Sequence, residues 1–203
     1  MSCLDFVSLS VYRNVCFKEF IVGQSNAFRD TRFDLHRGNI IRKGRDAIYR
    51  NLDIASPWYR SIHPTSLVIL VLSKVNPGFQ KDTLWGARMC EDVERIVHVD
   101  LNLPLIPILC VPGGSLDHKQ EIAAVKACPL IIAEHGTVTI PSIYATDDTV
   151  VISVGEKKHI KCAYLNRIPY IHLLFAIIEE KEKISEVIRY GIHLAATNFN
   201  LDY

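Results

Sequence analysis

The sequence lacks any apolar run of the roughly 18 to 20 residues that a membrane-spanning helix requires, and stretches such as Tyr170 to Ile178 are far shorter. It also lacks an excess of charge of either sign, because 23 Lys and Arg stand against 22 Asp and Glu, for a net charge of +1. Such a balance creates no long-range field for a polyanion. We therefore expect no membrane span in this chain and no nucleic-acid partner.

Several catalytic and targeting motifs are missing as well. The glycine-rich loop Val111 to Ser115 matches neither the P-loop nor GxGxxG, and no Gly-x-Ser-x-Gly elbow or Ser/His/Asp order suggests a hydrolase. There is no CxxC and no His/Cys cluster at zinc spacing, so no metal site is expected. The N-terminal stretch has an acid at Asp5 and no basic region before an apolar core, which is unlike a secretory signal.

The cysteines show no framework spacing. Cys110 and Cys128 stand beside apolar runs, which favours packed thiols over disulfide or metal roles, and the six cysteines are widely scattered: Cys3, Cys16, Cys90, Cys110, Cys128 and Cys162. We expect most of these thiols to be free. Two or more disulfides would instead indicate the secretory lumen.

The pattern that is present is a regular alternation of strands and helices beginning near Ser66. Apolar runs predict strands at 67–73, 105–111, 130–134, 150–154 and 170–175. Helical spacing is found near 40–52, at 82–99, from Ser115 or Asp117 to Ala127, at 138–145 and at 179–196. This alternation predicts an α/β, Rossmann-like domain over 65–203, with a parallel sheet covered by helices on both faces. Residues 1–64 are interpreted as an N-terminal segment or linker.

The most informative stretch runs from Leu130 to Gly155 and predicts a strand, a turn, a short helix and a second strand. Glu134, His135 and Gly136 leave the carboxyl edge of the sheet there, where open α/β sheets bind ligands and helix N–H groups favour a diphosphate. His135 is a candidate hydrogen-bond donor to the ligand, and the alternative is a turn histidine with local bonds. Glu134 is either a ligand contact or an ordinary edge residue.

Two cations are candidates for the same crevice. Lys74 ends the first strand, and Arg88 lies on the helix after it, so that either can neutralise a diphosphate leaving group. The alternative for each is a solvated surface cation. The nearby acids Asp147 and Asp148 are interpreted as a solvated turn before the strand at 150 rather than as catalytic groups.

Taken in order, several segments resemble glycosyltransferase family 61, which includes plant xylosyl- and arabinosyltransferases and the O-GlcNAc transferase of EGF-like domains. The segments are VCFKEFIVG (15–23), LVILVLSK (67–74), ARMCEDVERIV (87–97), KQEIAAVKACPLIIAEHG (119–136), VVISVG (150–155) and AYLNRIPYIHL (163–173). The resemblance implies a short or truncated GT-B enzyme, inverting and metal-independent, whose donor half corresponds to 65–203. Residues 1–64 would then hold part of the acceptor side.

By position, the resemblance implies that Lys74 replaces a family arginine, that Arg88 matches a basic residue and that His135-Gly136 matches the family's His-Gly. Val138 departs from the family, which tends to have a second glycine there, and lysine lacks the bidentate geometry of arginine. Members of the family carry a signal anchor that this sequence lacks. The expected compartment is the Golgi or ER lumen by resemblance, or the cytosol if this signal-less chain is complete.

Three functional hypotheses follow. The first is a glycosyltransferase that moves a sugar from a UDP-sugar to a protein or polysaccharide hydroxyl, with no cofactor and with the catalytic base unassigned. The second is a non-catalytic protein that binds a nucleotide sugar or acts as a scaffold, built on the donor half of the fold. The third is an unrelated Rossmann-like nucleotide-binding protein.

Overall fold

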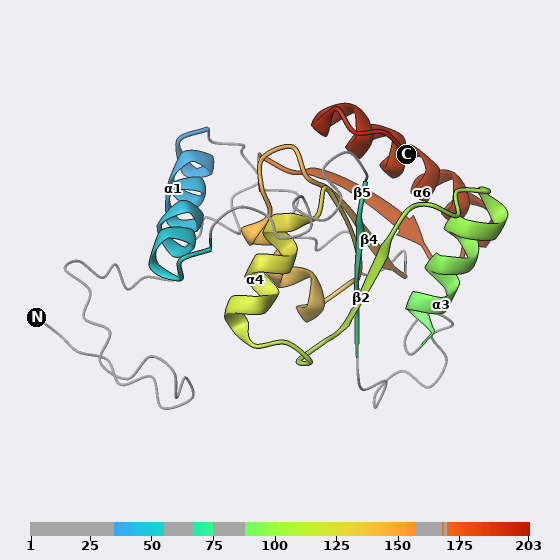
Figure 1. Ribbon diagram of the computed structural model, residues 1–203, viewed down its shortest axis with the longest axis horizontal. Helices are drawn as coiled ribbons and strands as arrows, with labels where there is room; N and C mark the ends of the chain where they lie inside the picture. The colour runs from blue at the N-terminus through green and yellow to red at the C-terminus, as the bar shows by residue number, and fades with distance from the viewer. Residues whose placement is uncertain (1–34, 55–66, 75–87, 157–167, 169) are drawn as a thin grey trace, which may run out of the picture. The chain divides into compact units, whose positions relative to one another are not determined.

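The computed structural model describes residues 35–54, 67–74, 88–156, 168 and 170–203 (Figure 1). The chain divides into two compact units, Met1–Arg32 and Phe33–Tyr203, and all described residues belong to the second. The expected domain boundary between residues 64 and 65 lies in the stretch 55–66, outside the described residues, and stays a prediction.

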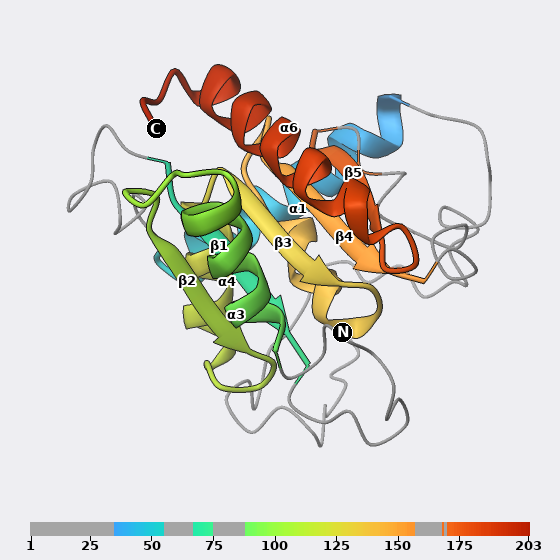
Figure 2. The ribbon, with the colours of Figure 1, turned by 90° about the vertical axis from the view of Figure 1, so that its right-hand side faces the viewer.

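A five-stranded parallel sheet forms the centre of this unit. Its strand order is β2-β1-β3-β4-β5, and every neighbouring pair is parallel (Figure 2). The strands are β1 (Ile69–Ser73), β2 (Ile108–Pro112), β3 (Leu130–Glu134), β4 (Val150–Gly155) and β5 (His172–Ile177). The predicted Rossmann-like α/β fold is confirmed, with strand bounds within three residues of the expected ones.

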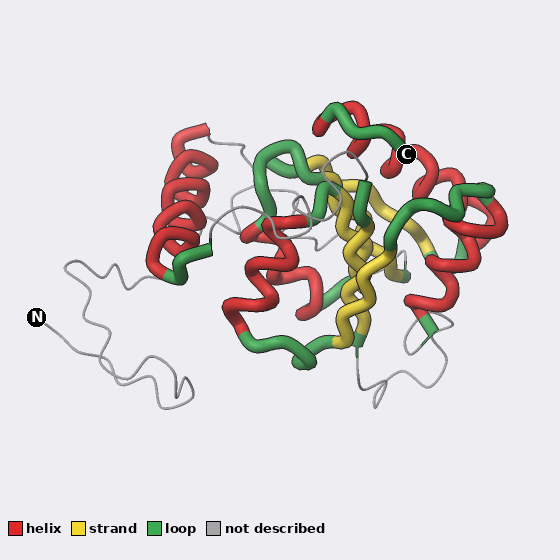
Figure 3. Tube along the Cα trace, viewed as in Figure 1, coloured by secondary structure: helices red, strands yellow, loops and turns green. Residues whose placement is uncertain are grey.

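Helices connect or flank these strands (Figure 3). They are α1 (Leu35–Asn51), α3 (Met89–Glu94), the π-helix η2 (Arg95–Asp100) that continues α3, α4 (His118–Ala127), the 3₁₀-helix η3 (Thr137–Tyr144) and α6 (Lys181–Phe199). Part of the helix expected over 82–99 falls on residues 75–87, which are not described. The short helix expected after β3 is present as a 3₁₀-helix, with Pro141 inside it.

Alternation along the strands explains why both faces of the sheet are covered. Ile69 and Val71 of β1 face a core shared with α3, η2 and α6, whereas Leu70 and Leu72 face a second core shared with α4. Successive side chains of a strand point to opposite faces, so a fully apolar strand requires cover on each side. Figure 1 shows α4 on one side of the sheet and α3 and α6 on the other.

A capping box explains where α4 begins. The Asp117 carboxylate accepts a hydrogen bond from the backbone N–H of Gln120 at 2.8 Å, and the Gln120 side chain accepts one from the N–H of Asp117 at 3.1 Å. These two bonds satisfy amides that otherwise lack partners in the first turn of a helix. Asp117 was one of the two residues expected to cap this helix.

The cysteines correct one sequence prediction. Cys110 of β2 is disulfide-bonded to Cys90 of α3, with 5.9 Å between the two Cα atoms, so the expectation that Cys110 is a packed thiol was wrong. Residues 20 positions apart meet because α3 packs back over the sheet beside β2, which spacing in the sequence cannot reveal. Cys128 is a buried free thiol, as expected. The remaining three cysteines lie outside the described residues.

Candidate functional site

The strand order places a switch point between β1 and β3. From β1 the chain crosses to β2 on one side, and it then returns to β3 on the other side. Connections that leave two adjacent strands in opposite directions open a crevice at their carboxyl ends, where open α/β sheets bind ligands. Lys74 directly follows β1 and Glu134 ends β3, so both lie at this switch point.

Lys74 and Glu134 form an ion pair there. Lys74 Nζ lies 3.2 Å from Glu134 Oε1, and the two side chains are 31% and 6% exposed. The second carboxylate oxygen, Oε2, is buried and has no hydrogen-bond partner among the residues that the structure describes. Burying a carboxylate costs free energy unless the carboxylate is paired. The Lys74 ammonium therefore compensates the negative charge of Glu134 at the end of β3.

Gly136 gives the turn beside Lys74 its backbone conformation. Its φ of +122° is a conformation that L side chains rarely adopt. A Cβ at this position would lie 3.4 Å from Lys74 Nζ and 3.5 Å from Lys74 Cε. Those distances are ordinary van der Waals contacts, so the backbone angle is the requirement that the glycine meets.

His135 lies on the other side of this turn, toward β4. Its Nδ1 is 3.4 Å from the hydroxyl oxygen of Ser153, and its backbone N–H donates to the Val154 carbonyl at 2.6 Å. A Cβ on Gly155 would lie only 2.7 Å from His135 Cβ, so the glycine of β4 makes room for the histidine. These local contacts suit the turn-histidine alternative, and a ligand role for His135 stays a prediction.

The turn after β2 also belongs to the rim of the switch point, by which we mean the residues that follow or end β1, β2 and β3 at their carboxyl ends. The N–H of Gly113 donates to the Ser73 carbonyl at 2.7 Å, which ties this turn to the end of β1. Val138 Cγ1 lies 3.3 Å from the position of a Cβ on Gly113. Val138 thus packs closely against the neighbouring turn.

Arg88 does not join this group in the described part of the structure. It is exposed, immediately before α3, and its recorded electrostatic interaction is with Asp92 one turn along the same helix. Burial raises the pKa of Asp92, and Arg95 and Arg88 oppose that shift. Of the five predicted donor-binding residues, four are therefore brought to the switch point: Lys74, Glu134, His135 and Gly136.

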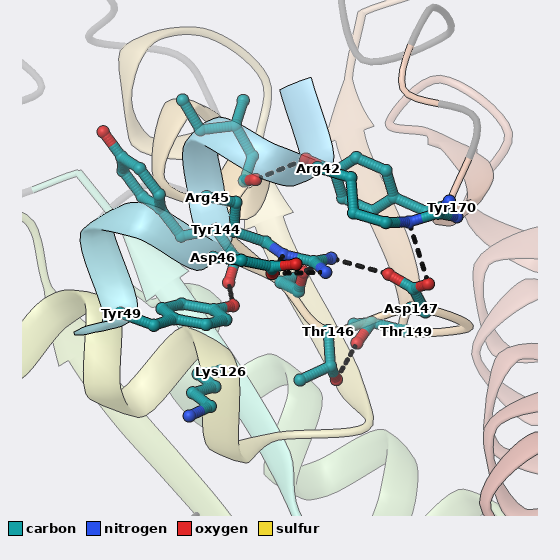
Figure 4. Close-up of polar contacts among 12 residues, drawn as sticks. Arg42, Arg45, Asp46, Tyr49, Lys126, Tyr144, Thr146, Asp147, Thr149 and Tyr170 are labelled. Atoms are coloured by element: carbon teal, nitrogen blue, oxygen red, sulfur yellow. Dashed lines mark hydrogen bonds and ion pairs between the residues drawn. The ribbon is translucent and has the colours of Figure 1, made fainter. Parts of the chain in front are cut away.

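A second polar cluster lies at the opposite, amino-terminal edge of the sheet (Figure 4). Arg45 of α1 is 7% exposed, and its Nη1 donates to the Ala145 carbonyl at 2.9 Å and to Asp147 Oδ1 at 2.7 Å. Arg42, one turn earlier, pairs with Asp147 Oδ2 at 3.0 Å. Asp147 and Asp148 both lie in the turn before β4, as expected, and Asp148 is exposed. The half-exposed Asp147 carboxylate, in addition, pairs with two arginines.

Aromatic rings surround the buried guanidinium. It lies 4.6 Å from the Tyr170 ring centroid and 5.6 Å from that of Tyr49. Burial alone lowers the pKa of Arg45, but hydrogen bonds to Asp147 and Asp46 outweigh it and raise the pKa. Burial raises the pKa of Tyr170 to about 12. These contacts attach α1 to the α/β core. The sequence analysis did not predict them, because the partners are about 100 residues apart in the chain.

Comparisons with known proteins add no family to this picture. Among the described residues, no helix is both long and apolar enough to cross a membrane. No protein-family model matches the chain, and no curated protein is significantly similar to it.

Proposed function

We propose that this chain binds a UDP-sugar at the β1/β3 switch point and transfers the sugar to a hydroxyl of a protein or polysaccharide. The resemblance to glycosyltransferase family 61 supports the reaction class. The observation that carries the location is the meeting of Lys74, Glu134 and Gly136 at the carboxyl ends of adjacent strands, beside His135. Cations and glycine turns at that edge are suited to a diphosphate.

In the proposed reaction, a carboxylate takes the proton of the acceptor hydroxyl, whose oxygen attacks the anomeric carbon as the UDP leaves. Lys74 stabilises the negative charge that develops on the departing diphosphate. The Lys74 side chain is 31% exposed, and the pairing of its ammonium with Glu134 keeps that group at the strand end before the ligand arrives. A lysine acts as a point charge and does not impose the two-point geometry of an arginine.

One observation favours the alternative of nucleotide-sugar binding without transfer. Glu134 is the acid at the switch point, but one of its oxygens is paired with Lys74 and the other is buried. Among the described residues of this rim, no second carboxylate is placed to accept a proton. The base that takes the proton of the acceptor hydroxyl would then lie on residues outside the described ranges or on a partner chain. If neither supplies a base, the protein binds the nucleotide sugar without transferring it.

A thermal-shift panel separates these hypotheses. UDP, UDP-GlcNAc, UDP-xylose and NAD are each added to the full chain, and a ligand at about 100 times its dissociation constant adds roughly 2.7 kcal/mol of stability. A shift with UDP and a UDP-sugar, but not with NAD, supports the donor site. A shift with NAD alone favours an unrelated nucleotide-binding protein, and no shift with any uridine nucleotide overturns the proposal.

Release of UDP then distinguishes transfer from binding. UDP is quantified after the chain is incubated with the UDP-sugar that binds and with candidate acceptors. Turnover supports the transferase. Binding without UDP release, in every acceptor mixture and at excess enzyme, supports the non-catalytic alternative.

A further inference from the structure

Three side chains that can ligate a metal meet on the face of the sheet covered by α3. Cys90 is near the start of α3, Glu94 is one turn later, and Cys110 lies on the edge strand β2. The two cysteines are half-buried and Glu94 is exposed, so reagents and ions can reach the group from solvent. It is separate from the switch point, since β1 lies between β2 and β3.

The distances from the Glu94 carboxylate to the two sulfurs are close to those between two ligand atoms of one metal ion. Glu94 Oε1 lies 3.6 Å from Cys90 Sγ and 3.9 Å from Cys110 Sγ. In a tetrahedral zinc site with Zn–S bonds of about 2.3 Å and Zn–O bonds of about 2.1 Å, sulfur and oxygen ligands are about 3.6 Å apart. Helical spacing explains the first distance, because residues four apart share one face of a helix.

We propose that, when the Cys90–Cys110 disulfide is reduced, the two thiolates and the Glu94 carboxylate bind a thiophilic divalent cation of the Zn²⁺ type, with water in the fourth position. The disulfide and the metal-bound dithiolate are alternative states of one site. An oxidising compartment keeps the first state, and a reducing compartment with available zinc favours the second.

The chemistry of the conversion balances with a dithiol as the reductant. The dithiol supplies two electrons and two protons, the S–S bond breaks to give two protein thiols, and the reductant becomes a disulfide. The cation then forms two metal–sulfur bonds as the thiols release two protons. Without a cation the two thiols stay protonated, because two thiolates beside a carboxylate would repel one another, and a divalent ion removes most of that repulsion.

Cobalt is the probe for the test, because Co²⁺ replaces Zn²⁺ in thiolate sites and its thiolate charge-transfer absorption reports sulfur ligation. The test protein carries the substitutions Cys3→Ser, Cys16→Ser and Cys162→Ser, so that Cys90, Cys110 and the buried Cys128 remain. After reduction and removal of the dithiol, we expect one Co²⁺ per chain, displaced by Zn²⁺. The oxidised protein should show no charge-transfer band.

Variants identify the ligands. Cys110→Ser should abolish the band, and Glu94→Gln should weaken Co²⁺ binding at least tenfold. Glu91→Gln, an exposed acid on the same helix, is the matched control and should bind as the parent does. Equal affinities for the Glu94 and Glu91 variants would overturn the three-ligand site.

A second measurement needs no substitution and remains valid if the serine background does not fold. The reduced natural chain is alkylated with iodoacetamide with and without Zn²⁺, and the modified cysteines are mapped by mass spectrometry. Zn²⁺ should protect Cys90 and Cys110 together. Equal alkylation of both in the presence and absence of Zn²⁺ would refute the site.

Discussion

Lys74 and Glu134, which are 60 residues apart in the chain, form an ion pair of 3.2 Å across the switch point between β1 and β3. The Glu134 side chain is 6% exposed and the Lys74 side chain is 31% exposed. The pair therefore links the proposed ligand site to the stability of the sheet, and substitutions at its two ends should have measurable consequences for both.

Replacing Lys74 by Met should destabilise the fold, because Glu134 would remain buried without a counter-charge. Breaking a buried pair costs about 3 to 5 kcal/mol, and solvent around Lys74 reduces this to about 1 to 3 kcal/mol. Urea unfolding measures the loss. The control is Lys183→Met, which removes the exposed pair with Glu180 and should cost less than about 0.5 kcal/mol. Equal losses in the two variants would contradict the role assigned to the pair.

Replacing Gly136 by Ala should destabilise the protein through the backbone. A φ of +122° is strained for alanine, whereas the new methyl group would make only an ordinary van der Waals contact with the lysine side chain. We expect a loss of about 1 to 3 kcal/mol in a thermal or urea melt. Gly44→Ala is the matched control: this glycine lies within α1 with nothing near its Cβ position, so the change should stabilise α1 by up to about 1 kcal/mol.

Replacing His135 by Ala distinguishes its two interpretations. If the imidazole contacts the nucleotide, UDP affinity measured by calorimetry should fall by about 1 to 3 kcal/mol, or roughly tenfold to a hundredfold, in a folded protein. If it only holds the turn beside Ser153, the melting temperature should fall and UDP affinity should be retained. That second result would remove His135 from the donor site.

Replacing Arg45 by Met should loosen α1 from the core. The variant loses hydrogen bonds to Asp147 and to the Ala145 carbonyl, and the half-exposed position of Asp147 limits the cost to about 1 to 3 kcal/mol. Hydrogen exchange of α1 amides should accelerate more than that of β3. Arg95→Met breaks an exposed pair with Asp100 and should leave exchange in α1 unchanged. Unchanged α1 exchange in the Arg45 variant would refute the anchoring role.

Alkaline pH should destabilise the protein through Tyr170. Burial raises the pKa of its phenol from 10.0 to about 12, so the unfolded chain ionises first. The stabilisation is complete below about pH 10 and is lost as pH rises toward 12. Tyr170→Phe should flatten the fall of unfolding free energy over this range, whereas Tyr190→Phe, at an exposed tyrosine, should not. Identical pH profiles for the two variants would contradict this assignment.

The sequence by itself determined the sheet and its cover. Continuous apolar runs such as 130–133 of β3 must be buried on both faces, and the helical patterns between them require parallel crossovers. Asp117 as a helix cap and Gly136 at a turn were also readable, because capping and positive φ are local properties of the chain.

Tertiary structure alone decided which distant side chains meet. Strand order is set by how whole elements pack, and it brought Lys74 to Glu134 while leaving Arg88 beside Asp92. The same packing joined Cys90 to Cys110 and Arg45 to Asp147. Periodicity reports only the environment of each element along its own length, whereas an ion pair or a disulfide depends on the relative placement of two elements, which the packed core fixes.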